Sequence, residues 1–352
     1  MKKSLIALAV IAASGAASAQ SSVTLYGLVD AYVGSVKVNG LTTTGINVPA
    51  AAGGGGLNTS RFGVKGSEDL GGGLKVNFLL EAGFDPSTGV SNSYTNPYTG
   101  ATSTALFGRQ SWVGLSGGFG EVKLGKMWTP FDDVKGSGAA AFDANIFAPA
   151  TFVWASNSYS DRPGNSIYYA TPSFGGITAA ALYSFGENKT STTGAGHIAS
   201  VNVAYAGGPV AAALSYQTEK ANGAVANTTK FAQLNASYDF GVVKLLGAVG
   251  HVKDGFNPLT GISVSKSQEY QLGLDFPVSS TFTVSGGYAW SKDTQLAGGP
   301  DIKRKGFGIA GLYALSKRTN LYAGVNDAKQ DEYTGVAEEK RRVFAVGVRH
   351  TF

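Results

Sequence analysis

The chain has 352 residues and a formal net charge of +5, with 43% hydrophobic residues and no cysteine. It therefore has no disulfide framework, and it lacks the basic block that is typical of nucleic-acid-binding proteins. Beyond residue 19 there is no apolar run of about 18 residues, the length that a transmembrane helix needs. The 50 glycines, 16 tyrosines and 19 phenylalanines favour many short strands joined by turns.

The first 19 residues, MKKSLIALAVIAASGAASA, have the three parts of a secretory signal peptide. Lys2 and Lys3 form a positive region, residues 5–13 form an apolar run, and residues 17–19 match a small-residue cleavage site. The apolar run is too short to span a membrane. We expect cleavage after Ala19, which leaves residues 20–352 with a net charge of +3.

Several segments alternate apolar and polar residues with a period of two, as β-strands do. The first is residues 23–32, VTLYGLVDAY, and three others are residues 231–240, 269–276 and 281–290. The apolar faces of these three carry Leu234, Ala236, Tyr238, Phe240, Tyr270, Leu272, Leu274, Phe276, Phe282, Val284, Gly286, Tyr288 and Trp290. Aromatic residues at the ends of such faces are typical of the girdles of transmembrane β-barrels.

Short and long connections alternate between the strands. Short ones fall at residues 69–73, 117–120 and 277–280, and long ones include residues 39–57 and 86–103. Counting the strands between them gives about 16. The pattern predicts an all-β fold, a 16-stranded antiparallel transmembrane β-barrel.

The chain ends on a period-two stripe, RRVFAVGVRHTF, at residues 341–352. Its apolar face carries Phe344, Val346, Val348, His350 and Phe352. We expect this last strand to pair with the first one, residues 23–32, because closure removes the unpaired edges that lipid does not tolerate. Arg349 and Thr351 then face the lumen.

Five stretches resemble one known family: SSVTLYGLVDAYVG (21–34), SRFGVKGSEDLGGGLKVNFLLEAGF (60–84), FGRQSWVGLSGGFGEVKLGK (107–126), NSIYYATPSFGG (165–176) and AVGVRHTF (345–352). The chain resembles the general diffusion porins of Gram-negative outer membranes. It is most similar to the trimeric porins of beta-proteobacteria, of the Neisseria, Bordetella, Comamonas and Burkholderia type. The resemblance covers the whole chain after residue 20, in order.

The resemblance implies passive diffusion of small hydrophilic solutes and ions across the bacterial outer membrane. It implies a homotrimer in contact with outer-membrane lipid and lipopolysaccharide, and barrel-assembly machinery that reads the C-terminal Phe352. It implies no enzymatic activity, no cofactor, no metal and no nucleic-acid partner.

The longest connection, residues 129–164, is 36 residues long and rich in Ala, Phe and Gly. Loops of this length are usually functional, and a loop in open solvent has no need of such residues. The resemblance implies that this third long loop folds into the lumen and forms the constriction.

Charged side chains on the strands are expected to face the lumen, because a charge facing lipid is costly. The resemblance places Arg61, Arg109 and Arg162 at the constriction, and Lys126 is a further basic candidate. The acidic candidates are Asp132, Asp133 and Asp143 in the loop, together with Glu81 on a strand; Lys65 and Lys75 are weaker pore-lining candidates. Arginines on the wall opposite loop acids predict a transverse field and a weak preference for anions.

Two details leave this prediction open. If Arg109 points inward on a regular strand 109–115, then Val113 and Leu115 do so too and Trp112 faces lipid, unless a bulge intervenes. In addition, Tyr168 or Tyr169 stands where the family often carries a charged residue.

The alternatives are a substrate-specific channel for sugar or phosphate, and an adhesin barrel without an open pore. A sugar channel could use Phe142, Phe147, Phe152 and Trp154 as a slide, although these side chains could equally pack the loop on the wall. An enzyme is not expected, because His197, His251 and His350 form no recognisable catalytic arrangement.

Overall fold

The computed structural model describes residues 22–48, 55–91, 93–97, 102–187, 189–192, 194–220, 228–256, 263–331 and 338–352. The expected signal peptide, residues 1–19, lies outside these ranges. None of the helices in the described ranges is long and apolar enough to cross a membrane.

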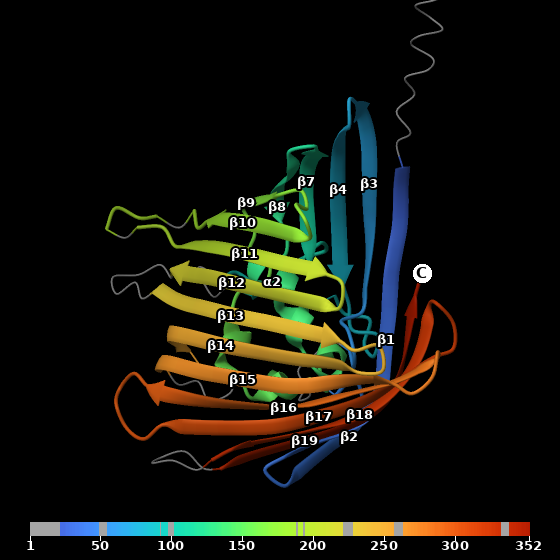
Figure 1. Ribbon diagram of the computed structural model, residues 1–352. Helices are drawn as coiled ribbons and strands as arrows, with labels where there is room; N and C mark the ends of the chain where they lie inside the picture. Colours follow the sequence, from blue (N-terminus) through green and yellow to red (C-terminus); the bar gives the residue numbers. More distant parts are fainter. Residues whose placement is uncertain are drawn as a thin grey trace, which may run out of the picture.

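The described residues form one large antiparallel sheet of 17 strands, in which β2 pairs only with the end of β1. The other 16 strands form a closed wall, which confirms the predicted barrel (Figure 1). The strands of the sheet are β1 (Ser22–Val38), β2 (Leu41–Ile46), β3 (Arg61–Gly71), β4 (Leu74–Gly83), β7 (Gln110–Gly117), β8 (Gly120–Lys126), β9 (Ser166–Ala170), β10 (Ile177–Phe185), β11 (His197–Gly207), β12 (Val210–Lys220), β13 (Thr228–Asp239), β14 (Lys244–Phe256), β15 (Ser263–Pro277), β16 (Phe282–Gln295), β17 (Ile302–Ala314), β18 (Thr319–Gln330) and β19 (Glu339–Thr351).

Strand β1 closes the barrel because its two halves have different partners. Residues 22–28 pair with β3, and residues 28–38 pair with β19. The backbones of Gly27 and Phe352 exchange two hydrogen bonds, of 3.1 and 3.0 Å. The predicted pairing of the first and last strands is therefore confirmed.

Two connections that the sequence marked only as long loops contain extra strands. β2 pairs with residues 33–38 of β1, on the edge opposite β19, and contains a β-branched run, Thr42–Thr44. Strands β5 (Ser93–Thr95) and β6 (Thr102–Thr104) form a separate short hairpin.

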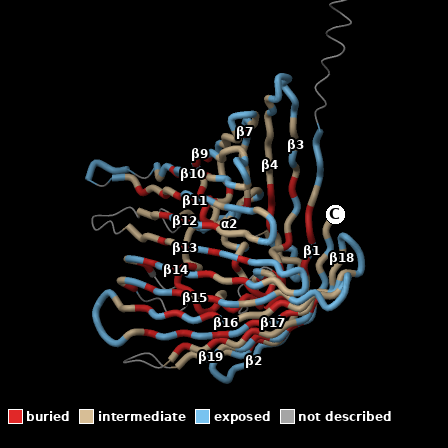
Figure 2. Tube along the Cα trace, viewed as in Figure 1, coloured by how far each residue is buried: buried red, intermediate tan, exposed pale blue. Residues whose placement is uncertain are grey.

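The two faces of the wall differ as the alternating pattern predicts, and Figure 2 shows buried and exposed residues following one another along the strands. The apolar stripes are exposed on the outer face, for example at Leu234, Leu272 and Trp290. The opposite face buries polar side chains such as Gln217, Asn235 and Ser285. The chain is thus apolar where it meets lipid and polar on the other side.

Residues 129–164 form a compact segment of helical turns, namely α2 (Pro130–Lys135) and the 3₁₀ helices η2 (Gly136–Gly138), η3 (Ala141–Asp143), η4 (Pro149–Phe152) and η5 (Ala155–Ser158). Thr129 caps α2 by accepting a hydrogen bond from the Asp132 N–H, and Pro130 occupies the first turn. The segment contacts the polar face of the wall from β11 to β18.

Candidate functional site

Charged side chains from three separate parts of the chain meet at Glu81, on β4. Arg109, directly before β7, donates from Nε to Glu81 Oε1 at 2.8 Å, and Arg61, at the start of β3, lies 3.7 Å from Oε2. The hydroxyl of Tyr26, on β1, donates to the same Oε2 at 2.9 Å. Because Glu81 and Arg109 are only 4% and 5% exposed, this network is rigidly held.

Trp128 extends the cluster towards the two ends of segment 129–164. The guanidinium of Arg162 lies 4.2 Å from the centre of the Trp128 ring, and that of Arg109 lies 5.5 Å from it. Arg162 also pairs with Asp161 at 2.9 Å, and Lys126 donates a hydrogen bond to the Arg162 carbonyl. We call Arg61, Arg109, Arg162 and Lys126, with Glu81 and Asp161, the arginine cluster. It contains four cationic groups and two carboxylates.

The acids of the segment form a second group. Asp132 accepts a hydrogen bond from the Tyr159 hydroxyl, and Asp133 accepts one from Tyr168 at 3.0 Å. Asp143 is exposed and lies in a run of three residues with positive φ. Partial burial raises the pKa of Asp132 to about 6. Among the described residues, no ion pair joins these three acids to the arginine cluster.

Neutral polar side chains of the wall hold the segment in place. They form hydrogen bonds of 2.7–3.0 Å with its backbone, which satisfies polar groups that form no regular helix or sheet. The residues are Ser200 and Asn202 of β11, Gln217 of β12, Gln271 of β15, Ser291 of β16 and Asn326 of β18.

Glycine on the wall allows the segment to approach closely. A Cβ atom at Gly308, on β17, would lie only 1.7 Å from the carbonyl oxygen of Phe147. A Cβ atom at Gly273, on β15, would lie 2.4 Å from the Cβ atom of Ala140. These positions therefore require glycine for the segment to reach its observed place.

The family, sequence and structure comparisons with known proteins all agree. The family model described as Gram-negative porin matches residues 5–333. The chain is 37% identical to outer membrane porin protein 32 of Delftia acidovorans, over 99% of this chain and 95% of that protein. It is 32% identical to an outer membrane porin of Bordetella pertussis, over the full length of both. Its fold matches that of the anion-selective porin from Comamonas acidovorans with a TM-score of 0.75 and 31% identity, covering 95% and 100% of the two chains.

The chain belongs to the Gram-negative porin family. This porin is accordingly a β-barrel channel of the bacterial outer membrane that small hydrophilic solutes cross by diffusion. The resemblance that the sequence motifs indicated is confirmed. The family consists of channels rather than enzymes.

At Arg109 of this porin the structure has a bend, and neither a regular strand from residue 109 nor a bulge. Strand β7 begins at Gln110, so Arg109 precedes the strand and does not share its alternation. Val113 and Leu115 are exposed on the outer face, whereas Trp112 packs against Met127 and Tyr168 and lies 4.8 Å from Lys123 Nζ. Arg109 reaches Glu81 from a bend, and no bulge is involved.

The two weaker basic candidates of this porin lie at different heights on the wall. Lys65 Nζ lies 5.3 Å from the centre of the Tyr26 ring, next to the Glu81 network. Lys75 is opposite Asp69, beside the short turn between β3 and β4. It is six residues from Glu81 along the same strand, which is about 20 Å.

The aromatic residues of segment 129–164 pack on the wall. Phe147, Phe152 and Trp154 are buried in one hydrophobic cluster, and Phe142 packs against its edge. They form no exposed row along which a sugar could slide, so the packing interpretation holds in this porin.

Sequence reasoning missed Trp128, Tyr26 and Asp161. Trp128 lies two residues after Lys126, and Asp161 directly precedes Arg162, so proximity to expected pore charges was a usable signal. No sequence signal marked Tyr26, because it belongs to an ordinary strand pattern.

Proposed function

We propose that the narrowest part of the pore lies between the helical turns of segment 129–164, residues 130–158, and the arginine cluster. The meeting of Arg61, Arg109 and Arg162 around Glu81 and Trp128 is the observation that carries this proposal. Solutes pass this point by passive diffusion, limited by size, and no enzymatic step or cofactor is involved. Lys126 and Lys65 contribute positive charge beside the same point.

We also propose a weak preference for anions. Four cations face only two carboxylates in the cluster, so the local potential is positive. Asp132, Asp133 and Asp143 oppose it from the segment and create a transverse field. The Comamonas relative is described as anion-selective, which supports the same preference here. Because the Debye length is about 8 Å at physiological salt, the preference should fall as salt rises.

The assembly follows from the family. We propose a homotrimer, and small aliphatic residues on the outer face of β1 and β19, including Val29, Val33, Val346 and Val348, suit such an interface. We further propose cleavage of residues 1–19, contact with lipopolysaccharide, and recognition of Phe352 by the barrel-assembly machinery.

The test is the reversal potential of the purified protein in planar bilayers under a tenfold KCl gradient, at about 0.1 M and about 1 M mean salt. The wild type should show anion preference that shrinks at the higher salt. The triple variant Arg61→Gln, Arg109→Gln and Arg162→Gln should lose it or become cation-preferring. Glu81→Gln should move the reversal potential in the opposite direction.

Arg318→Gln is the matched control, because Arg318 lies exposed in the short turn between β17 and β18. It removes one arginine far from the cluster and should leave selectivity unchanged. Cation preference of the wild type would show that the loop acids dominate. Absence of conductance from folded protein would refute an open pore.

A further inference from the structure

Asp30, on β1, is an acidic side chain that is completely buried on the inner face of the wall. Its exposed fraction is 0%, and it alternates with the outward-facing Val29. Within the described ranges no cation pairs with it. Arg349 lies directly opposite it on β19 but donates to the Asn58 side chain, at 2.7 Å. A buried acid without a cation needs hydrogen-bond donors of another kind.

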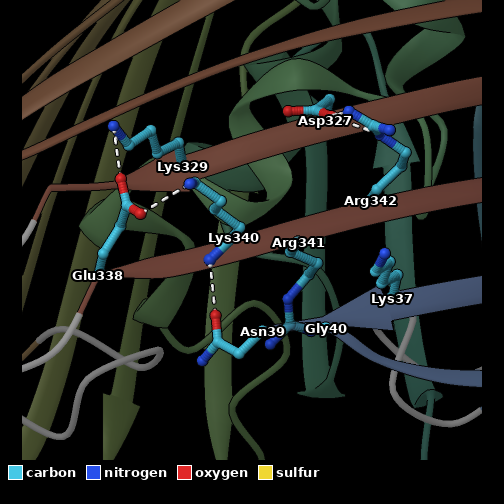
Figure 3. A pocket seen from close by; sticks show the side chains of 9 residues that line it. All are labelled: Lys37, Asn39, Gly40, Asp327, Lys329, Glu338, Lys340, Arg341 and Arg342. Atoms are coloured by element: carbon cyan, nitrogen blue, oxygen red, sulfur yellow. Dashed lines mark hydrogen bonds and ion pairs between the residues drawn. The ribbon is translucent and has the colours of Figure 1, made fainter.

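The acidic side chains of a pocket at the rim of the barrel behave differently (Figure 3). The pocket has a volume of about 670 Å³ and lies where β18, β19 and β1 meet. Glu338 binds Lys329 at 2.5 Å and Lys340 at 2.7 Å. Asp327 binds Arg342 at 2.6 Å. These two carboxylates neutralise cations at the rim, which is not what the side chain on β1 does.

Three successive backbone amides bind the Asp30 side chain. The Gly56 N–H donates to Oδ1 at 3.2 Å. The N–H groups of Leu57 and Asn58 donate to Oδ2, at 3.0 and 2.8 Å. The hydroxyl of Tyr322, on β18, also donates to Oδ1. Successive amides that converge on one point form a concave anion site called a nest, and here the protein's own carboxylate occupies it. We call this arrangement the aspartate nest.

Two glycines allow the backbone to wrap around the carboxylate. They are the described members of the run of four glycines at residues 53–56. Gly55 has a φ of +117°, and a Cβ atom there would lie 2.0 Å from the Asn58 carbonyl oxygen. A Cβ atom at Gly56 would lie 2.1 Å from the Tyr322 hydroxyl oxygen. The nest therefore gives this part of the glycine run a structural reason.

The aspartate nest leads directly into Arg61 of the arginine cluster. The ladder between β1 and β3 ends at the pair of Leu28 and Arg61. Beyond this pair the Ser60 hydroxyl accepts from the Asp30 N–H at 2.9 Å and donates to the Asp30 carbonyl at 3.1 Å. The stretch 56–60 is thus bound to Asp30 at both ends, which fixes the point where Arg61 enters the wall.

The same stretch also contacts segment 129–164. The Asn145 N–H donates to the Leu57 carbonyl at 3.1 Å. The Ile146 N–H donates to the Gly56 carbonyl at 3.2 Å. Leu57 and Ile146 are buried in one hydrophobic cluster. The nest therefore lies between the wall and the segment and contacts both.

We propose that Asp30 is a positioning residue for the constriction. It contacts no passing solute, and its nest holds Arg61 on one side and segment 129–164 on the other. A carboxylate suits this task because it only accepts hydrogen bonds and has two oxygens, which three N–H groups and one hydroxyl satisfy. The neutral asparagine side chain has a single acceptor oxygen. The inference rests on the proposed role of the arginine cluster in selectivity.

The sign of the selectivity change in Asp30→Asn tests the proposal. If Asp30 acted on ions through its charge alone, removing that charge would raise the anion preference. If it positions Arg61, the loss of an acceptor oxygen releases the nest and the anion preference falls. We expect the anion-to-cation permeability ratio to fall by at least about 1.5-fold, measured from reversal potentials in planar bilayers.

Gly56→Ala tests the nest without changing any charge, and it carries the test if Asp30→Asn does not assemble. Its Cβ atom would collide with the Tyr322 hydroxyl and push the Gly56 amide away from Asp30. The anion preference should fall as in Asp30→Asn. Asp239→Asn is the matched control, because Asp239 accepts from the Gly241 N–H at 2.7 Å but lies exposed at the short turn after β13. It should keep the wild-type selectivity.

Two further measurements separate this inference from the proposed function. In an Arg61→Gln background, Asp30→Asn should have at most about half of its effect on selectivity, because the arginine that it positions is gone. Hydrogen–deuterium exchange of the purified protein in detergent micelles follows the nest itself. The amides of residues 56–58 should exchange faster in Asp30→Asn and Gly56→Ala than in the wild type.

The outcomes can be told apart. An unchanged reversal potential in Arg61→Gln would refute the proposed role of the arginine cluster, and faster exchange in Asp30→Asn would then still support the nest. If Arg61→Gln lowers the anion preference while Asp30→Asn raises it or leaves it unchanged, the positioning role is overturned. Equal exchange in Asp30→Asn and the wild type would overturn it as well.

Discussion

Two parts of the inner wall differ in how they use polar residues. From β11 to β18 the wall presents mainly serine, asparagine and glutamine, which bind the backbone of segment 129–164. From β3 to β7 it presents Arg61, Glu81 and Arg109, which bind one another. Neutral side chains satisfy most of the segment's backbone in the first part, where the buried Glu269 and the buried Arg304–Asp293 pair are charged exceptions. In the second part the charged side chains satisfy one another.

One closed sheet therefore contains two parts with separate tasks, namely the covered part from β11 to β18 and the charged part from β3 to β7. The covered part holds segment 129–164 in place, and in the proposed constriction the charged part acts on the passing solute. The two parts meet at Trp128, where the ends of the segment return to the wall. A change in the covered part should therefore alter the size of the pore, and a change in the charged part its selectivity.

The largest effect is expected from Gly308→Leu, which disrupts the packing of segment 129–164 on the wall. The new side chain would occupy the place of the Phe147 carbonyl and displace the segment from β17. Single-channel conductance in planar bilayers should rise by at least about twofold, because the segment no longer narrows the pore. Selectivity should fall at the same time.

Gly118→Leu serves as its control. Gly118 lies in the short turn between β7 and β8, and a Cβ atom there would meet nothing within 4 Å. This variant adds the same side chain and should conduct as the wild type does. Unchanged conductance in Gly308→Leu would mean that the segment does not set the pore size.

A smaller effect is expected from lowering the pH, because this protonates acidic side chains of segment 129–164 itself. The pKa of Asp132 is raised to about 6, so this carboxyl is mainly ionised at neutral pH and mainly protonated at about pH 5. Acidification removes a negative charge, and the anion-to-cation permeability ratio should rise by roughly half. Reversal potentials recorded between these pH values measure it.

Burial raises the pKa of the neighbouring Asp133 to about 6 as well. Asp132→Asn should therefore reduce the step near pH 6, and the double variant Asp132→Asn, Asp133→Asn should abolish it and show the low-pH selectivity of the wild type throughout. A step that persists in the double variant would assign the titration to another group.

The smallest effect is expected from Lys75→Gln. Lys75 lies at the short-turn end of β4, away from both parts. Its removal should leave the reversal potential within experimental error, since a charge about 20 Å away is screened beyond the Debye length. A shift as large as that of Arg61→Gln would place a second charge filter near the turns.

The alternation of residues was sufficient to predict the wall. Within β13 and β15, residues 232–239 and 269–276 repeat polar and apolar residues without interruption, and lipid on one side favours that pattern. It failed at Arg109, where the strand begins one residue later than the pattern suggests. Strand ends depend on turns and tertiary contacts, which alternation does not encode.

The site was predictable only in its charged members. Arg61, Arg109 and Arg162 were expected near one another, and they all contact Glu81 or Trp128. The residues that hold the segment, such as Ser291 and Asn326, were not foreseen. A serine or asparagine on a water-facing strand looks ordinary in sequence, and its partner is defined only by a contact with residues far away in the chain.

The anchoring of segment 129–164 also sets an order of events during folding. The segment precedes most of its partners in the chain, and Asn326, which binds the Ala148 carbonyl, comes 178 residues later. The segment therefore cannot reach its final position until β18 has joined the sheet. Contacts of such long range form slowly, so the proposed constriction should be completed only after the wall of the barrel has formed.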